Sequence, residues 1–211
     1  MCFSENISLF AFIVGMAGSM LVYSLGEIYD KIYGIFHMFI SFMQLVDFFL
    51  WRNQTCDAYN YIISITGIIL NHLQPLVLGL LILYYNTRLS YQDKIMILCI
   101  LCIYLCVIIP YSWQYIDKTQ CTLKNSNNHL DWKWNWQKYH VFAYGAFVLT
   151  LLLLYFRFVP VYGKLFAIIA VFSFISSAII YKNELGNMWC FYSLLFPILY
   201  YLFRGLKAFN N

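Results

Sequence analysis

The sequence predicts an all-helical membrane protein, a bundle of seven transmembrane helices that forms a single domain over residues 1–211. Hydrophobic residues make up 63% of the chain and charged residues only 10%, whereas soluble proteins carry about a quarter charged residues. The aromatic share of 21% is typical of the belts that form where helices leave a bilayer. Windows of about 20 apolar residues, long enough to cross a membrane, recur along the whole chain.

The apolar windows define the expected spans and the loops between them. We expect the first window to be a span and not a signal peptide, because no basic stretch precedes it and no small-residue cleavage site follows it. The one long loop lies at about 113–138, on the expected outer side. The seven spans are Ile7–Leu25, Ile32–Leu50, Tyr61–Tyr85, Ile95–Ser112, Tyr139–Phe158, Tyr162–Tyr181 and Met188–Phe203.

The distribution of basic residues predicts the orientation. The loops and tail on one side hold seven Lys and Arg against three acids, and those on the other side hold six against five. Since cytoplasmic loops are the ones enriched in Lys and Arg, the N-terminus is expected outside or in a lumen and the C-terminus in the cytoplasm. The expected location is a plasma, endomembrane or viral membrane, with the lipid bilayer as a partner.

Two features of the expected outer loops agree with this orientation. Asn53-Gln54-Thr55 is a sequon for N-glycosylation. Cys56 and Cys121 also lie in outer loops, where a disulfide would tie the loop after the second span to the long loop. Free thiols are the alternative, and Cys190 and Cys2 are further disulfide candidates on the same side.

Aromatic residues are concentrated in the long loop. Trp132, Trp134 and Trp136 alternate with polar residues, and His129 precedes them. This alternation indicates either a short strand or a segment that lays its indole rings on the lipid headgroups. The second interpretation, an aromatic lid at the interface, is favoured.

Polar side chains share one stripe of the second span. His37, Ser41 and Gln44 are spaced at i, i+4 and i+7, which places them on one helical face, and Asp47 follows nearer the outer end. A carboxylate in the centre of a bilayer costs about 2.5–3.5 kcal/mol, so this stripe is expected to face the bundle interior or a water-filled cavity.

A polar segment, Asn71-His72-Leu73-Gln74-Pro75, interrupts the apolar third span. Pro75 has no backbone N–H and its ring clashes with the carbonyl of Asn71, so that carbonyl is expected to be free for another partner. At about 1.5 Å per residue, His72 lies roughly 7 Å deeper than Gln44 and roughly 12 Å deeper than Asp47. Gln44 is therefore the expected neighbour of His72 on the second span.

These polar groups favour a transporter or a receptor-like protein that binds a small polar ligand in a cavity open to the outer side. His72, Gln74 and Gln44 would form its polar wall, with Asp47 and His140 nearer the mouth. The candidate ligand-binding residues are His72, Gln74, Asn71, Gln44, His37, Asp47, His140, His129 and Trp132.

Two other functions stay open. A structural or scaffold protein, for instance of a viral envelope, would use the same polar groups to hold helices together. A metal-dependent enzyme would use at least two histidines, but no HxxxH or HExxH spacing supports a metal site, so a non-enzymatic role is favoured. The sequence identifies no cofactor. It contains no block of basic residues that would bind nucleic acid, and a homo-oligomer stays open.

Glu27 and Asp30, at the end of the first span, are expected to be solvated.

Several segments resemble a family of small polytopic membrane proteins of microbial eukaryotes and large DNA viruses, which begin Met-Cys-(Phe/Trp)-Ser. The matching segments are Met1-Cys2-Phe3-Ser4 with Ser8 and Gly15, Phe42-Met43-Gln44-Leu45, Asn53-Gln54-Thr55-Cys56 with Asn60, His72-Leu73-Gln74-Pro75, and Cys121 with His129-Leu130-Asp131-Trp132. The resemblance covers the first two thirds of the chain and implies no particular reaction. Relatives carry Glu-Leu-x-Gln in the second span. In this chain Asp47 is the only acid of that span, so it stays open whether Asp47 corresponds to the glutamate of the relatives.

Overall fold

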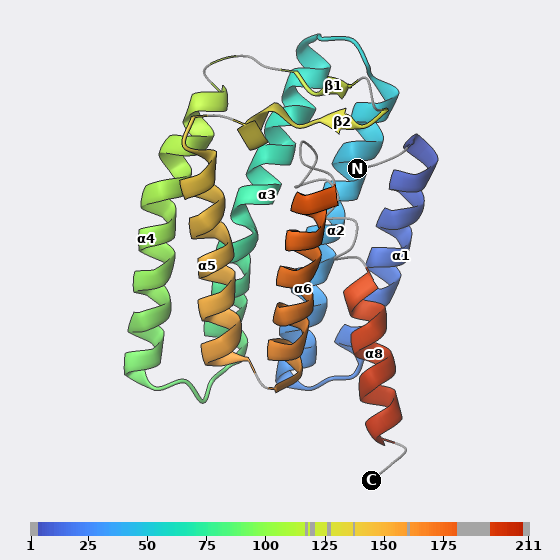
Figure 1. The fold of residues 1–211 in the computed structure, drawn as a ribbon. Helices are drawn as coiled ribbons and strands as arrows, with labels where there is room; N and C mark the ends of the chain where they lie inside the picture. The colour runs from blue at the N-terminus through green and yellow to red at the C-terminus, as the bar shows by residue number, and fades with distance from the viewer. Residues whose placement is uncertain are drawn as a thin grey trace.

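The computed structural model describes residues 4–116, 118, 121–125, 128–136, 138–159, 161–180 and 195–208. Its helices run along one common direction, and a two-stranded hairpin lies across one end of the bundle, which we call the cap end; the opposite end is the base (Figure 1). The elements are α1 (Glu5–Ser24), α2 (Ile28–Arg52), α3 (Ala58–Tyr85), α4 (Tyr91–Ile116), β1 (Leu123–Lys124), β2 (Leu130–Asp131), the 3-10 helix η1 (Lys133–Trp136), α5 (His140–Phe158), α6 (Val161–Ile180) and α8 (Leu195–Ala208).

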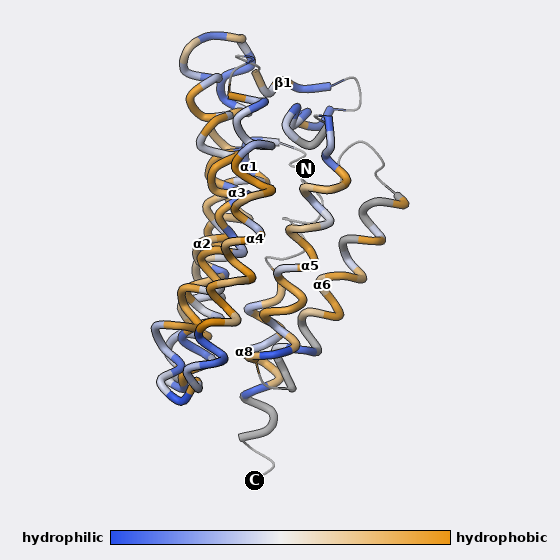
Figure 2. The backbone as a smooth tube through the Cα atoms, turned by 90° about the vertical axis from the view of Figure 1, so that its left-hand side faces the viewer, coloured by the Kyte–Doolittle hydropathy of each residue, from blue (hydrophilic) through white to orange (hydrophobic). Residues whose placement is uncertain are grey.

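The predicted helical bundle is confirmed. Among the described residues, five helices, α1 to α5, are long and apolar enough to cross a membrane. Helix α6 covers the sixth expected span, and α8 covers the end of the seventh; the beginning of that span lies outside the described residues. Hydrophobic residues fill the middle of the helices and hydrophilic residues gather at the two ends (Figure 2).

Helices α1 and α3 begin before the apolar windows do, because polar residues cap them. The Ser4 hydroxyl accepts a hydrogen bond from the backbone N–H of Ile7, and the Asp57 carboxylate accepts one from that of Asn60. Such caps satisfy N–H groups that the first turn of a helix leaves without a partner. Consecutive helices then pack on one another from α1 to α6, and α8 returns to contact α1, α2 and α6.

Helices α1 and α2 approach each other closely at Gly34. A Cβ atom at this position would lie 2.8 Å from the backbone oxygen of Ser19 and 2.9 Å from the backbone nitrogen of Tyr23. Both atoms belong to the α1 backbone, which cannot rotate away as a side chain can. The contact therefore requires glycine.

Replacing Gly34 by alanine is expected to lower the free energy of unfolding by about 1–3 kcal/mol, because the two helices must move apart. Gly145→Ala is the matched control: nothing lies within 4 Å of a Cβ there, and alanine favours a helix interior over glycine by about 0.5–1 kcal/mol. Thermal unfolding of both variants separates the two effects. Equal unfolding temperatures would contradict the close contact.

Candidate functional site

Helix α2 places three polar centres along the bundle. Asp30 lies near the base, His37 near the middle and Asp47 near the cap, and all three are buried. The stripe predicted on this helix is buried along its whole length, including Ser41 and Gln44. The expectation that it faces the bundle interior is confirmed.

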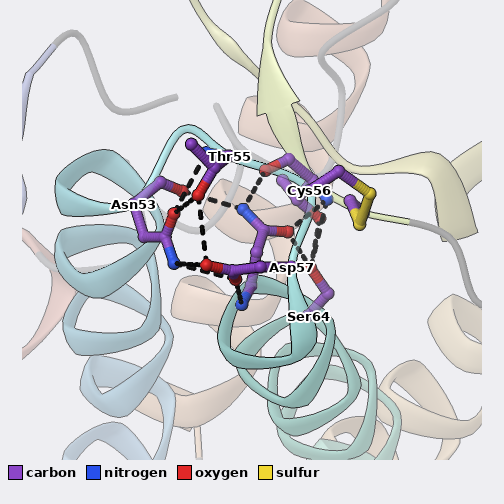
Figure 3. Close-up of a disulfide and its surroundings, with 8 residues drawn as sticks. Asn53, Thr55, Cys56, Asp57 and Ser64 are labelled. Carbon is purple, nitrogen blue, oxygen red and sulfur yellow. Dashed lines mark hydrogen bonds between the residues drawn. A yellow bond between two sulfur atoms is a disulfide. The ribbon is translucent and has the colours of Figure 1, made fainter.

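At the cap end, a disulfide joins Cys56, before α3, to Cys121, before β1 (Figure 3). This is the predicted bridge between the two outer loops. Next to it, the Asn60 side chain donates to the backbone oxygen of Thr122 (2.9 Å) and accepts from its N–H (3.0 Å). The Ser64 hydroxyl donates to the hydroxyl of Thr122 (2.9 Å). Helix α3 thus holds the start of the long loop by both covalent and hydrogen bonds.

The sequon lies beside the disulfide (Figure 3). The Thr55 hydroxyl donates to the side-chain oxygen of Asn53 (2.5 Å), and the Asn53 amide nitrogen donates to Asp57 (3.0 Å). The backbone N–H of Asn60 and the side chain of Asn53 hold the pKa of Asp57 below its usual value, because both donate to its carboxylate. Glycosylation of Asn53 stays a prediction, and the other disulfide candidates, Cys2 and Cys190, lie outside the described residues.

Trp132 and Trp134 of the long loop point into the protein, which corrects the expectation of an interfacial lid. Trp132 and Trp134 are fully buried, with stacked rings 4.9 Å apart between centroids. The indole N–H of Trp132 donates to the buried carboxylate of Asp47 (3.0 Å), and the hydroxyl of Tyr111 donates to the backbone oxygen of Trp134. The segment is held inside because a buried carboxylate needs donors there. It forms a plug, residues 130–134, at the cap end.

His72 faces α4 and α5. Its Nδ1 lies 2.7 Å from the hydroxyl of Ser112 on α4, and its ring packs against Tyr111 and Tyr144 at centroid distances of 5.7 and 6.0 Å. Ser112 also donates to the backbone oxygen of Ile108, within its own helix (2.8 Å). The sequence missed this partner because a serine in an apolar helix is an ordinary residue until its neighbour is known.

A hydrogen bond from α4 reaches the α3 backbone at His72, one residue after Asn71, whose carbonyl is the one that Pro75 leaves without an N–H partner. Pro75 lies inside α3, and the hydroxyl of Tyr104 on α4 donates to the backbone oxygen of His72 (2.7 Å). The neighbouring Asn71 uses its side-chain nitrogen to donate to the Tyr144 hydroxyl (3.4 Å). This part of α3 therefore joins three helices through hydrogen bonds.

Gln74 lies on the opposite face of α3 from His72. Two residues along an α-helix correspond to a rotation of about 200°, so the two side chains cannot share one wall. Gln74 instead lines a cavity of about 40 Å³ between α2, α3, α5, α6 and α8. The lining residues are Tyr33, Phe36, His37, Ile40, Gln74, Val148, Leu151, Leu152, Tyr155, Ala167, Ala170, Val171 and Phe196.

Two buried nitrogen atoms of the lining residues have no hydrogen-bond partner in the part of the chain that the structure describes. They are Nε2 of His37 and Nε2 of Gln74, on side chains that are only 3% and 1% exposed. Unsatisfied buried polar atoms are rare in proteins, because each costs about 1–3 kcal/mol. The cavity is the place where a partner for both can be held. Tyr33 and Phe196 flank His37, with ring centroids 4.5 and 6.3 Å away.

A buried ion pair closes the bundle below the cavity. The Tyr200 hydroxyl on α8 donates to the Asp30 carboxylate (2.7 Å), and the Arg204 guanidinium donates to it (3.2 Å) and pairs with Glu27 (2.7 Å). Asp30 is completely buried, so the expectation that it is solvated is wrong. The ring of Tyr33 stacks on Tyr200 with 4.7 Å between centroids, which connects the cavity wall to this ion pair.

Asp30 shares a helical face with the cavity residues Tyr33 and His37, at i, i+3 and i+7. This spacing is a signal that could have identified it as a buried group. The remaining candidates lie at the cap end: His129 is in the turn of the β1–β2 hairpin, and His140 begins α5. Within the described residues, no three potential metal ligands come together.

Comparison with protein-family models, with curated proteins and with solved structures finds no match to this chain. The resemblance to the Met-Cys-(Phe/Trp)-Ser proteins therefore stays a prediction. Any functional conclusion has to come from the cavity, the plug and the ion pair themselves.

Proposed function

We propose that this chain is a multi-pass membrane protein with seven spans and that it binds a small polar ligand in the central cavity, as a transporter or receptor-like protein. Large apolar side chains cover the outside of the bundle, a surface that suits lipid and not water. Examples from five different helices are Phe10, Tyr84, Ile103, Phe142 and Phe172, each more than two thirds exposed.

The cap end would face the outside or a lumen. The disulfide between Cys56 and Cys121 supports this orientation, because disulfides persist in oxidising compartments. The base carries the basic loops, including Arg88 and Arg157, which fits the cytoplasmic side. Plasma, endomembrane and viral membranes all satisfy both conditions.

The observation that supports a ligand most strongly is the pair of unsatisfied nitrogens on His37 and Gln74 beside a cavity. At about 1.5 Å per residue, His37 lies roughly 14 Å from the base end of α2, and Gln74 roughly 17 Å from the base end of α3. Both are therefore at the same depth, near the middle of the bundle. Polar groups at this depth are expensive in a membrane and commonly mark a ligand path.

The cavity lies between two closures, an arrangement that fits transport by alternating access. Along α2, Asp30 of the ion pair comes first, the cavity residues Tyr33 to Ile40 follow, and Met43 to Leu50 then pack against the plug. Along α2, the ion pair thus lies on one side of the cavity and the plug on the other. Opening the ion pair would lead to the cytoplasm, and moving the plug would lead to the outside.

The interhelical hydrogen bonds of His72 favour a structural role for that residue, as in the scaffold alternative. Its Nδ1 is joined to Ser112 and its carbonyl to Tyr104. We therefore assign His72 to holding α3 against α4, and His37 and Gln74 to the ligand. The two groups make different predictions about ligand binding.

Gln74→Met is expected to abolish ligand binding without loss of stability. Methionine has a similar shape but no polar group to leave unsatisfied, so the free energy of unfolding should stay equal or rise by about 1–2 kcal/mol. The measurement is thermal unfolding of purified protein with and without a panel of small polar solutes. A ligand at one hundred times its Kd adds about 2.7 kcal/mol to the wild type, and this gain should be lost.

His72→Phe serves as the contrast. It keeps an aromatic ring but removes the hydrogen bond to Ser112 and also the Nε2 atom of His72, which is buried without a partner among the described residues. The two effects oppose each other, so stability should change by no more than about 1 kcal/mol while stabilisation by the ligand persists. If no solute stabilises the wild type more than Gln74→Met, the protein has no ligand in this cavity and the scaffold function is left. If Gln74→Met unfolds as readily as a disrupted core variant, the amide is structural.

A further inference from the structure

The size of the cavity limits what it can hold. One buried water requires about 10–15 Å³ of such space, so a cavity of about 40 Å³ has room for roughly three water-sized groups. A whole sugar, nucleotide or amino acid exceeds the volume of this cavity, which is not fully enclosed. The ligand is therefore a small solute, or the cavity holds only a small part of a large one.

The described part of the lining also disfavours a charged ligand. None of the described lining residues is Asp, Glu, Lys or Arg, and most are aliphatic or aromatic. Asp30, the acid below the cavity, is already bonded to Tyr200 and Arg204. An ion moved into such surroundings loses its hydration and gains no opposite charge, at a cost of several kcal/mol.

The two unsatisfied nitrogens define the polar contacts. The side-chain amide nitrogen of Gln74 is a donor and requires an acceptor, and Nε2 of His37 donates or accepts according to its tautomer. We propose that the ligand is an uncharged molecule of roughly three or four non-hydrogen atoms whose carbonyl or hydroxyl oxygen is bound by Gln74 and His37. This inference rests on the proposed function and specifies the class of ligand that the cavity binds.

Acetamide is a suitable probe, because its carbonyl accepts from Gln74 and its methyl group suits the apolar walls. Acetate and acetamidinium have nearly the same shape but carry a negative and a positive charge, and benzamide is a larger neutral amide. Saturation-transfer NMR on the purified full-length protein detects weak binding of each probe. The variants are Gln74→Met and His37→Phe, and Gln92→Met, at an exposed position of α4, is the matched control.

We expect saturation transfer to acetamide and none to its charged analogues or to benzamide. Losing one hydrogen bond should weaken acetamide binding by about threefold to tenfold in Gln74→Met and His37→Phe, and not in Gln92→Met. Equal binding of acetate, acetamidinium or benzamide would overturn the class of ligand. The proposed class of ligand would also be overturned if acetamide did not bind, or if it bound equally to the wild type and all variants.

These failures differ from a failure of the proposed function. If the class alone is wrong, some other solute still stabilises the wild type over Gln74→Met in the thermal panel. If the cavity binds no ligand, no solute of any size or charge does so. The two experiments together therefore distinguish a wrong ligand from a wrong site.

Discussion

Arg204→Met is expected to lower the free energy of unfolding by about 3–5 kcal/mol, because it leaves the buried carboxylate of Asp30 without its cation. Asp30 is completely buried, and Arg204 is the cation that contacts it in the described part of the chain, with the Tyr200 hydroxyl as a further donor. The measurement is thermal unfolding of the purified protein. A large loss would show that α8 is held to α2 by this ion pair.

Two controls make the result specific. Arg157→Met breaks a more exposed ion pair with Asp93 and should change stability by at most about 1 kcal/mol. The double variant Asp30→Asn/Arg204→Met removes both charges and should recover most of the loss, since an amide is far less costly to bury than a carboxylate. Arg204→Met with wild-type stability would contradict a buried ion pair at the base.

In the proposed transporter, the same substitution has a functional consequence. Weakening the contact between α8 and α2 favours the conformation that is open to the cytoplasm, because the ion pair exists only when this end is closed. The free-energy difference between the closed and the open form then shifts in favour of the open form by the amount that the contact loses. The base closure would thus regulate access to the His37 and Gln74 site.

Trp132→Ala is the second large effect that we expect, a loss of about 3–5 kcal/mol. The side chain is 1% exposed, stacks on Trp134 and donates to Asp47, so its removal takes away packing and a hydrogen bond to a buried carboxylate together. Thermal unfolding measures the total loss. Trp132→Phe keeps much of the packing and should show a smaller loss, which isolates the hydrogen bond.

Trp113 provides the matched control for this prediction. It is on α4, towards the cap end, but is 66% exposed, so Trp113→Ala should alter stability by no more than about 0.5 kcal/mol. Similar losses for Trp113→Ala and Trp132→Ala would mean that the loop rests on the surface as an aromatic lid. That result would support the interfacial aromatic lid, which the burial of the Trp132 and Trp134 indoles contradicts.

Local sequence patterns were sufficient to predict the five long apolar helices, α1 to α5. Runs of apolar residues marked the helices, because a helix surrounded by apolar material needs apolar side chains along its length. The i, i+4, i+7 spacing of His37, Ser41 and Gln44 identified a buried face, which the structure confirms. The bridge between Cys56 and Cys121 was one of two alternatives, the other being free thiols, and the structure contains the bridge.

Contacts between distant residues were decided by the tertiary structure alone. Asp30 and Arg204 are 174 residues apart, and Asp47 and Trp132 are 85 apart, so no local pattern relates them. They meet because α8 returns to α2 and the long loop folds back between helices.

The sequence also could not predict the orientation of the polar segment in α3. Its composition showed that Asn71-His72-Leu73-Gln74-Pro75 is polar at mid-helix, but not which helix each side chain meets. The packing of α4 and α5 on one face and α2 on another sends His72 to Ser112 and Gln74 to the cavity. Periodicity determines the angle between two side chains on a helix, whereas only the packing of the other helices decides what each side chain contacts.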